Sequence, residues 1–415
     1  MRSLKGPVEV KQKSDESPRP ADRQAILSER QRLKMARSAH AYVRGNAAKF
    51  YEWLASRNRE RPQGPPVWIC GDCHLGNLGP VADADGNVAI QIRDLDQSVI
   101  GNPADDLIRL GLSLAMAARG SDLPGVTTAK MIEKMIEGYD QAFAPRGAAG
   151  HREGMRPEVI RVVMRQAVDR TWKTLANERI KNVKPTIPRG KSFWRLSRPE
   201  QRAIDDLFQT EEVRRLATSL RARKNRAEIE VLDAAYWVKG CSSLGRLRFA
   251  VLLGIGDHHH GESGLCLMDV KEAVQAVAPR SPKADMPRDN ARRVVEGARH
   301  LVPSLGERML PAHLLQKSVF IRELLPQDLK VEIDRLTRDE AMHAARYLAW
   351  VVGKAHARQV SAEDRRHWRK EMSRSHSKRL DAPSWLWSSV VDLVSSHEAA
   401  YLDHCRKYAM DDSVS

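Results

Sequence analysis

Apolar residues recur at helical spacing near the start of the chain. In 28–39 and 40–55 they return every three or four positions, as Leu33 and Ala36 illustrate. This period predicts two amphipathic helices. The Pro- and Gly-rich stretch 61–66 ends the second helix.

The spacing of apolar residues then shortens. A run of four, 67–70, predicts a buried strand, and 88–92 predicts a returning strand. Between them, Asp-Ala-Asp-Gly-Asn at 83–87 is typical of a hairpin turn. Beyond this hairpin the helical period returns. The expected helices cover 104–119, 127–143, 156–179 and 198–222.

The second half of the chain mixes both patterns. Short apolar runs separated by glycines over 236–271 predict a small antiparallel sheet, and 319–324 predicts one more strand. Further helices are expected over 288–301, 338–359 and 383–410. Sheet and helical segments that are separated in this way predict an α+β fold.

The composition adds limits on partners and location. The chain has 415 residues, enough for one large two-lobed domain, and its formal net charge of +16 favours anionic partners. No RNA-recognition or zinc-finger pattern accompanies the basic residues, so nucleic-acid binding is not expected. Residues 1–22 are polar and predict a disordered tail. Five scattered cysteines and the lack of an 18-residue apolar run predict a cytoplasmic protein without a membrane span.

Candidate chemistry is concentrated in Gly-Asp-Cys-His-Leu-Gly-Asn at 71–77. Asn77 follows Asp72 by five residues, which is the kinase spacing between the acid that orients the attacking hydroxyl and an amide ligand of magnesium. Asp94 and Asp96 follow the returning strand, which brings them back beside this loop. Magnesium binds one or two carboxylates together with phosphate oxygens and water, so acids at this strand end suit it.

These motifs resemble those of the aminoglycoside and choline phosphotransferases, a branch of the protein-kinase-like fold. After the Gly-Asp-x-His-x-x-Asn loop and a hairpin come Ile92-Arg93-Asp94, one residue longer than the Ile-Asp of that branch, and Gly-x-Pro-x-x-Asp-Leu at 101–107. Over 35–360 the chain also resembles a bacterial family catalogued as domain of unknown function 2252. The shared blocks are Arg44-Gly45, 72–77, 94–96, 240–245 and 270–273.

The resemblance implies a role for each polar residue of the catalytic block. Asp72 is the implied catalytic base, which orients the acceptor. The implied magnesium ligands are Asn77, Asp94 and Asp96, and the implied structural supports of the loop are His74 and Asp106.

A phosphate cradle is expected at 239–245, because the glycines of this segment let the backbone fold over phosphates. Lys271 ends a strand about 26 residues later, where the small-lobe lysine of a kinase reaches the phosphates. Its expected partner is Glu296, with Glu272 as the competing acid, and 319–328 is the expected hinge that meets adenine. The predicted nucleotide-binding residues are Gly240, Ser243, Gly245, Lys271, Glu296 and Glu323.

The order of these motifs differs from that of a kinase, in which the glycine loop and the lysine precede the catalytic loop. The sequence therefore predicts a protein-kinase-like, two-lobed α+β fold that is circularly permuted. The catalytic part of the large lobe is expected at 23–227, the small lobe at 228–325, and the helices that complete the large lobe at 326–415.

The predicted activity is transfer of the γ-phosphoryl group of ATP, with Mg²⁺, to an acceptor that the sequence does not identify, although the basic surface suits an anionic one. Three alternatives stay open. The first is a nucleotide-binding regulator of pseudokinase type, and the second is a nucleotidyl transferase. The third and more remote one is a basic nucleic-acid-binding protein.

Overall fold

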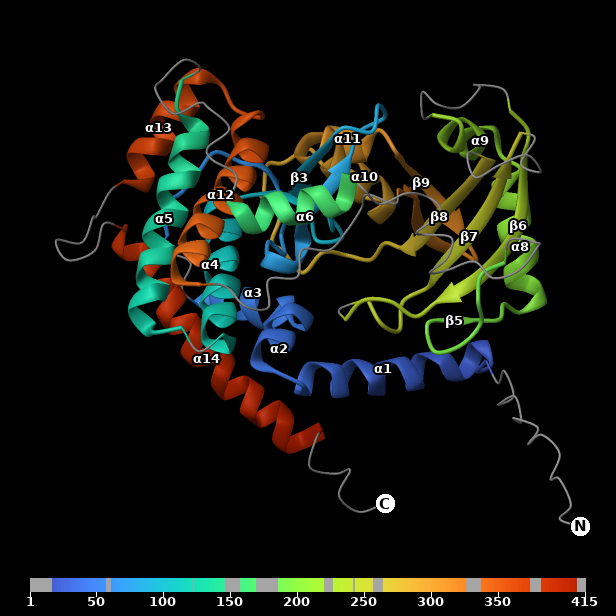
Figure 1. Cartoon of the computed structure of the whole chain (residues 1–415), viewed down its shortest axis with the longest axis horizontal. Coiled ribbons are helices and arrows are strands. Elements are labelled where there is room, and N and C mark those ends of the chain that lie inside the picture. The colour runs from blue at the N-terminus through green and yellow to red at the C-terminus, as the bar shows by residue number, and fades with distance from the viewer. Residues whose placement is uncertain are drawn as a thin grey trace, which may run out of the picture.

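In this computed structural model a group of helices and a six-stranded sheet lie side by side in a mixed α/β fold (Figure 1). The residues that the structure describes are 17–56, 61–121, 123–145, 157–168, 186–219, 227–241, 243–256, 264–325, 337–373 and 382–408. No helix in these ranges is both long enough and apolar enough to cross a membrane.

Three helices open the described part of the chain. They are α1 (Pro20–Ala36), α2 (Ala39–Gly45) and α3 (Ala47–Ser56), and they cover the two helical segments predicted there. Helix α1 begins inside the stretch 1–22 that was predicted to be disordered, because Pro20 stands in its first turn and presets the helical φ angle. Residues 1–16 lie outside the described residues.

Two short antiparallel pairs carry the catalytic segment. Strand β1 (Val67–Ile69) pairs with β4 (Val99–Gly101), and β2 (Leu78–Ala82) pairs with β3 (Val88–Ile92). The predicted strands at 67–70 and 88–92 and the turn between them are confirmed. A 3₁₀ turn at Leu75–Asn77 leads from the loop into β2.

Helix α4 (Pro103–Gly120) lies at the centre of the helical group. Its first turn is fixed by Pro103 and by Asn102, whose side chain accepts a hydrogen bond from the Ala104 amide. Nearly all of its residues are buried, including its two first-turn acids. The surrounding helices are α5 (Gly125–Phe143), α6 (Glu158–Val168), α12 (Arg338–Ala357), α13 (Ala362–Met372) and α14 (Ser384–Tyr408).

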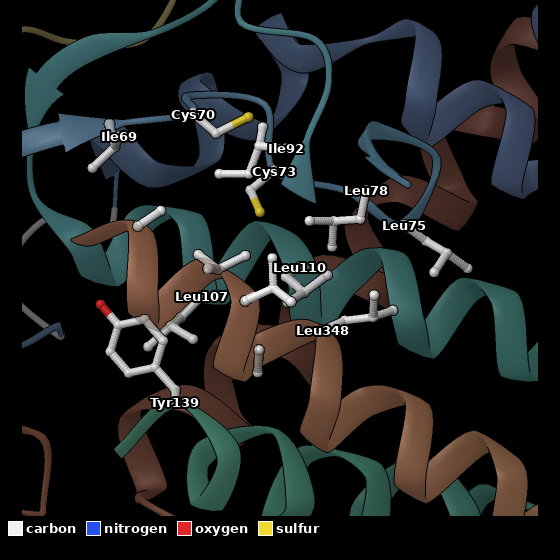
Figure 2. Packing of buried hydrophobic residues seen from close by; sticks show 14 of the residues in the cluster. Ile69, Cys70, Cys73, Leu75, Leu78, Ile92, Leu107, Leu110, Tyr139 and Leu348 are labelled. Carbon is white, nitrogen blue, oxygen red and sulfur yellow. The ribbon is translucent and has the colours of Figure 1, made fainter. Parts of the chain in front are cut away.

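The loop at 70–77 packs on this helical core through its apolar side chains. Cys73 and Leu75 of the loop lie over α4, which carries Leu107 and Leu110, and Leu348 of α12 lies next to them (Figure 2). The loop thus rests on rigid helices rather than on other loops. Helix α12, predicted over 338–359, therefore packs against the loop at 70–77.

The large sheet is antiparallel, with the order β5-β6-β7-β8-β10-β9. Its strands are β5 (Phe193–Trp194), β6 (Ile229–Trp237), β7 (Arg248–Ile255), β8 (Leu265–Glu272), β9 (Met309–Leu314) and β10 (Lys317–Leu324). Side chains alternate between the two faces. On β8, Met268 and Val270 enter an apolar core, whereas Asp269 and Lys271 belong to the opposite face.

The helices around this sheet correct one expectation. The single helix predicted over 198–222 is interrupted at Gln209 and Thr210, which separate α8 (Arg198–Phe208) from α9 (Glu211–Ala217). Both helices pack on the sheet through Phe208 and Leu216. The remaining elements are α10 (Asn290–Leu301) and the short α11 (Pro303–Gly306).

Candidate functional site

The loop at 70–77 has a backbone shape that only glycine tolerates at one position. Gly71 has φ +75°, and a Cβ atom there would lie 2.1 Å from the carbonyl oxygen of Gln97. The hydroxyl of Tyr51 donates to the Gly71 carbonyl at 2.5 Å. This contact fixes the peptide that directly precedes Asp72.

Asp106 braces the same loop from α4. Its two carboxylate oxygens accept the backbone N–H groups of Cys70 at 2.7 Å and Gly71 at 3.0 Å. Nε2 of His356, on α12, lies 3.1 Å from Asp106 Oδ2, and Nδ1 of His356 lies 2.8 Å from the Tyr139 hydroxyl. The acid, the imidazole and the phenol are all buried, so the loop is tied to three helices through one polar chain.

Asp106→Ala is expected to lower the free energy of unfolding by about 3–5 kcal/mol, because it leaves two buried N–H groups and a buried imidazole without their acceptor. Chemical denaturation monitored by circular dichroism measures this. Asp206→Ala, at an exposed position of α8, is the control and should change stability by less than about 0.5 kcal/mol. Equal stability of the two variants would contradict the bracing role.

The carboxylate of Asp72 is held by the side chain of an arginine. Nε of Arg109, on α4, donates to Asp72 Oδ1 at 2.9 Å. Nη2 lies 2.8 Å from the same oxygen and donates to the Val43 carbonyl at 2.6 Å. Burial raises the pKa of Asp72, and the positive charge of Arg109 opposes this rise. Burial also holds the pKa of His74 well below its usual range, so the imidazole 3.8 Å from Asp72 Oδ2 is neutral.

Asn77 is fixed by both of its neighbouring segments. Its Nδ2 donates to the Asp72 carbonyl at 2.9 Å, and its own carbonyl accepts the Arg93 N–H at 2.7 Å. Because the amide nitrogen is committed to the loop, the amide oxygen is the group that remains for a cation. Asn77 lines the same pocket as Asp72.

Lys271 joins the sheet to the catalytic hairpin. Its Nζ lies 3.3 Å from Asp94 Oδ1 and 2.5 Å from Asp96 Oδ2, although the lysine is 177 residues from Asp94 in the chain. Burial alone would raise the pKa of Asp94, but the charges of Lys271 and Arg322 outweigh it and lower that pKa. Burial and the neighbouring Asp94 raise the pKa of Asp96. Lys271 therefore contacts both acids, but the pKa of Asp94 is lowered and that of Asp96 is raised.

A second ion cluster holds the sheet against the hairpin. Asp269 on β8 accepts two hydrogen bonds from Arg248, at 2.8 and 2.6 Å, and lies 3.1 Å from Arg322 of β10. Arg322 also donates to the Arg93 carbonyl at 3.0 Å, one residue before Asp94. The two arginines keep the pKa of Asp269 well below its usual range despite its burial. This cluster sets the spacing between β8 and the strand end at Asp94.

The glycine segment forms the loop between β6 and β7. Gly240 and Gly245 have φ of +98° and +89°, and Ser243 Oγ donates to the Lys239 carbonyl at 3.2 Å. Among the described residues of this loop, Arg246 is the one that lines the pocket, and its Nη1 lies 4.0 Å from Asp96 Oδ2.

Two predicted nucleotide-binding acids lie elsewhere. The expected pair between Glu296 and Lys271 is absent from the described contacts, because Glu296 faces Arg299 and His300 of its own helix. The side of α10 near the site carries Arg293 instead, which donates to the carbonyls of Ser98, Asp96 and Val274. The competing acid, Glu272, pairs with Lys317. Glu323 is fully buried on β10, opposite Met268 of β8.

Some of the residues described above line one pocket of about 160 Å³. Helices α1 to α3 supply Gln31, Gly45, Asn46, Ala47 and Ala48. The loop at 70–77 and the segment that follows β3 supply Asp72, Asn77, Asp94, Asp96 and Gln97. The lining is completed by Arg246 and Val277. Sequence reasoning missed Arg109, Arg246 and Gln31. Arg109 follows Asp106 by three residues, on the same helical face, which is a signal that the sequence did contain.

The oxygen donors at the site are too few to hold a metal ion without other ligands. In the described ranges, no three or more His, Cys, Asp or Glu residues gather closely enough to hold an ion without help. Asp96 Oδ1 is nevertheless buried without a hydrogen-bond partner in the described contacts, and an ion near it would satisfy that oxygen. A site of few protein ligands fits magnesium bound together with phosphates, and does not fit a zinc cage. Cys70 and Cys73 are buried, and their mutual contact and burial raise the pKa of Cys70.

The fold and site define a mixed α/β protein with a pocket lined by acidic residues, two of which, Asp94 and Asp96, pair with a lysine of a six-stranded sheet. The chain belongs to the family described as uncharacterized protein conserved in bacteria, domain of unknown function 2252, whose family model matches residues 23–407. No curated protein and no solved structure matches the chain.

Proposed function

We propose that this protein is an ATP- and magnesium-dependent phosphotransferase with a circularly permuted, kinase-like architecture. The observation that carries the proposal is the contact of Lys271 with Asp94 and Asp96, beside the loop of Asp72 and Asn77. Phosphoryl transfer needs this set: a cation for the phosphates, acids and an amide for magnesium, and an acid for the acceptor.

The order of elements in the sheet supports the permuted architecture. Strand β6, the glycine loop, β7, then β8 with Lys271, and finally α10 follow one another along the chain. In the small lobe of a kinase the glycine loop, the lysine strand and a helix occur in the same order. The catalytic loop precedes them here, so the connection between the two parts differs while their juxtaposition is kept.

The exposed fractions of the Asp94 and Asp96 side chains suggest different roles for the two acids. The Asp94 side chain is 42% exposed and the Asp96 side chain 12%. We therefore assign Asp94, with Asn77, to magnesium and Asp96 Oδ2 to pairing with Lys271, which leaves Asp96 Oδ1 for the ion. In this assignment Asp96 takes the part that a glutamate of the following helix takes in a kinase.

The protein's own side chains would act mainly by positioning the phosphates and the acceptor. Lys271 and Arg246 would neutralise phosphate oxygens, and Asp72 would accept a hydrogen bond from the acceptor hydroxyl and then its proton. Magnesium, when bound, would offset the negative charge of the phosphates. Arg109 would keep Asp72 ionised and fix its orientation. Positioning and charge neutralisation account for most of the catalysis in reactions of this type.

MgATP binding to wild type and to Asp94→Asn tests the proposal. A 100-fold excess over Kd should raise the free energy of unfolding of the wild type by about 2.7 kcal/mol, seen as a thermal shift. Asp94→Asn should lose most of this shift, because a neutral amide is a poorer magnesium ligand than a carboxylate. Asp85→Asn, at the exposed turn of the same hairpin, should keep it.

The outcome also separates the alternatives. No shift with MgATP in any variant would contradict a nucleotide site. Binding without turnover would favour a nucleotide-binding regulator. If label from the α-phosphate rather than the γ-phosphate of ATP enters the product, the protein transfers the nucleotidyl group.

A further inference from the structure

A second pocket, of about 230 Å³, lies between β3 and α12, which are neighbours in the fold (Figure 1). Strand β3 supplies four consecutive residues, 89–92, and α10 supplies its last residue, Leu301. Helix α12 supplies Tyr347, Trp350, Val351, Lys354, Ala355 and Arg358. None of these residues lines the pocket of Asp72, so the two pockets are separate.

One edge of β3 has no strand beside it in the described part of the chain, because β2 and β3 form a two-stranded sheet. In the register of this pair, the Arg93 N–H donates to the Asn77 carbonyl and the Asp83 N–H to the Asn87 carbonyl. Hydrogen-bonded and non-hydrogen-bonded pairs alternate along an antiparallel ladder. The backbone groups of residues 89 and 91 therefore face β2, and those of Ile90 and Ile92 face the other edge.

This second edge borders the pocket. Successive side chains of a strand point to opposite faces, so a cavity that touches four consecutive residues lies beside the strand and not over one face. The N–H and C=O groups of Ile90 and Ile92 are therefore directed toward the pocket. An uncovered strand edge offers both donors and acceptors to whatever binds along it.

An aromatic pair on α12 lines the pocket opposite this edge. The ring centroids of Tyr347 and Trp350 are 5.7 Å apart, and the ring planes differ by 30°. Leu301 and Val351 add aliphatic surface beside them. Rings of this kind stack on other flat rings and gain more than the buried area alone provides. The pocket therefore favours a planar aromatic molecule.

The charged lining residues of this pocket are both cations, Lys354 and Arg358. Lys354 Nζ lies 4.5 Å from the centroid of the Trp350 ring. Arg358 Nε donates to the Lys354 carbonyl at 3.3 Å, which leaves the two terminal nitrogens of the guanidinium for a ligand. Burial lowers the pKa of Arg358. A partly desolvated guanidinium at a pocket without lining acids favours a carboxylate, which it can bind with two parallel hydrogen bonds.

We propose that this pocket is a second ligand site, which binds a small planar aromatic carboxylate. The aromatic ring lies against Trp350, and the carboxylate pairs with Arg358 and Lys354. Polar atoms at the ring edge meet the backbone of Ile90 and Ile92. The inference does not depend on the proposed phosphotransfer, because none of these residues takes part in it.

Binding of benzoate to the full chain tests the class of ligand. Benzamide has the same shape without the charge, and cyclohexanecarboxylate has the charge without the aromatic ring. Benzoate should bind about tenfold more tightly than either control, because only benzoate combines ring stacking with a charge-assisted hydrogen bond. Titrations followed by NMR signals of the ligand give the three dissociation constants. No binding of benzoate, or equal affinity for all three molecules, would overturn the proposal.

A matched pair of variants tests the place of binding. Arg358→Gln should weaken benzoate binding about tenfold and leave benzamide binding unchanged, because it removes one charge from the pocket. Arg366→Gln makes the same change at an exposed position of α13 outside the pocket and should bind benzoate as the wild type does. Ala89→Phe, at an exposed position of β3, fills the pocket and should weaken both ligands. Equal affinity of Arg358→Gln and Arg366→Gln for benzoate, or unchanged binding by Ala89→Phe, would overturn this placement.

Discussion

Asp72→Asn should lower phosphoryl transfer by about 10²–10⁴-fold, the range that loss of a positioned acid or base costs. An amide cannot accept the proton of the acceptor hydroxyl. MgATP should still bind, because magnesium is assigned to Asn77 and Asp94 and not to Asp72. Transfer of the γ-label at saturating ATP, together with a separate Kd for MgATP, measures the two effects apart.

The asparagine is chosen because it retains an oxygen for Arg109, whose guanidinium otherwise loses its buried partner. Circular dichroism and the thermal shift with MgATP check that the variant is folded. Asp85→Asn is the control on the same hairpin and should retain full turnover. Turnover of Asp72→Asn within a few-fold of wild type would remove the catalytic assignment.

Arg109→Gln should displace the pH profile of transfer. Burial raises the pKa of Asp72, and Arg109 lowers it, so removing the positive charge leaves the rise unopposed. The active form is the carboxylate, which disappears as pH falls through its pKa. The acidic limb of the profile should therefore move to higher pH, with activity lost most at the acidic end and regained as the pH rises.

This shift separates an electrostatic role from a merely structural one. A variant that is only less stable would lose activity at every pH by a similar factor. Arg109→Lys, which restores a positive charge without the two-pronged contact, should return the acidic limb toward that of the wild type. An unchanged limb in Arg109→Gln would show that the arginine does not control the ionisation of Asp72.

The local parts of the fold were predictable because their signals lie within short stretches. The strands at 67–70 and 88–92, the turn between them and the helix after Asn102 depend on neighbouring residues, and all are present. The break at Gln209 was not predicted, because the apolar spacing continues across it. Strands β2 and β4 are short and were missed, since each is defined by its partner strand rather than by its own pattern.

The candidate site shows the same limit. The spacing of Asp72 and Asn77 is local and visible in the sequence, whereas the partner of Lys271 is a matter of tertiary packing. A strand lysine followed by a helix suggested Glu296, but the rotation of α10 places Arg293 toward the site. Asp96 became the partner because Asp269 and two arginines fix the distance between β8 and the hairpin. No sequence spacing encodes that distance.

The attachment of α1 to α14 has a consequence for how the protein is made. The hydrogen bond between Tyr401 and Ala36 spans 365 residues, and that between Trp53 and Asp392 spans 339. Contacts of such long range close slowly during folding, because the loop entropy is lost before the contact is gained. The side of the pocket that Gln31 and Asn46 form is therefore held by α14, which is translated after every other described element. The pocket is therefore complete only after the chain has been translated beyond Tyr401.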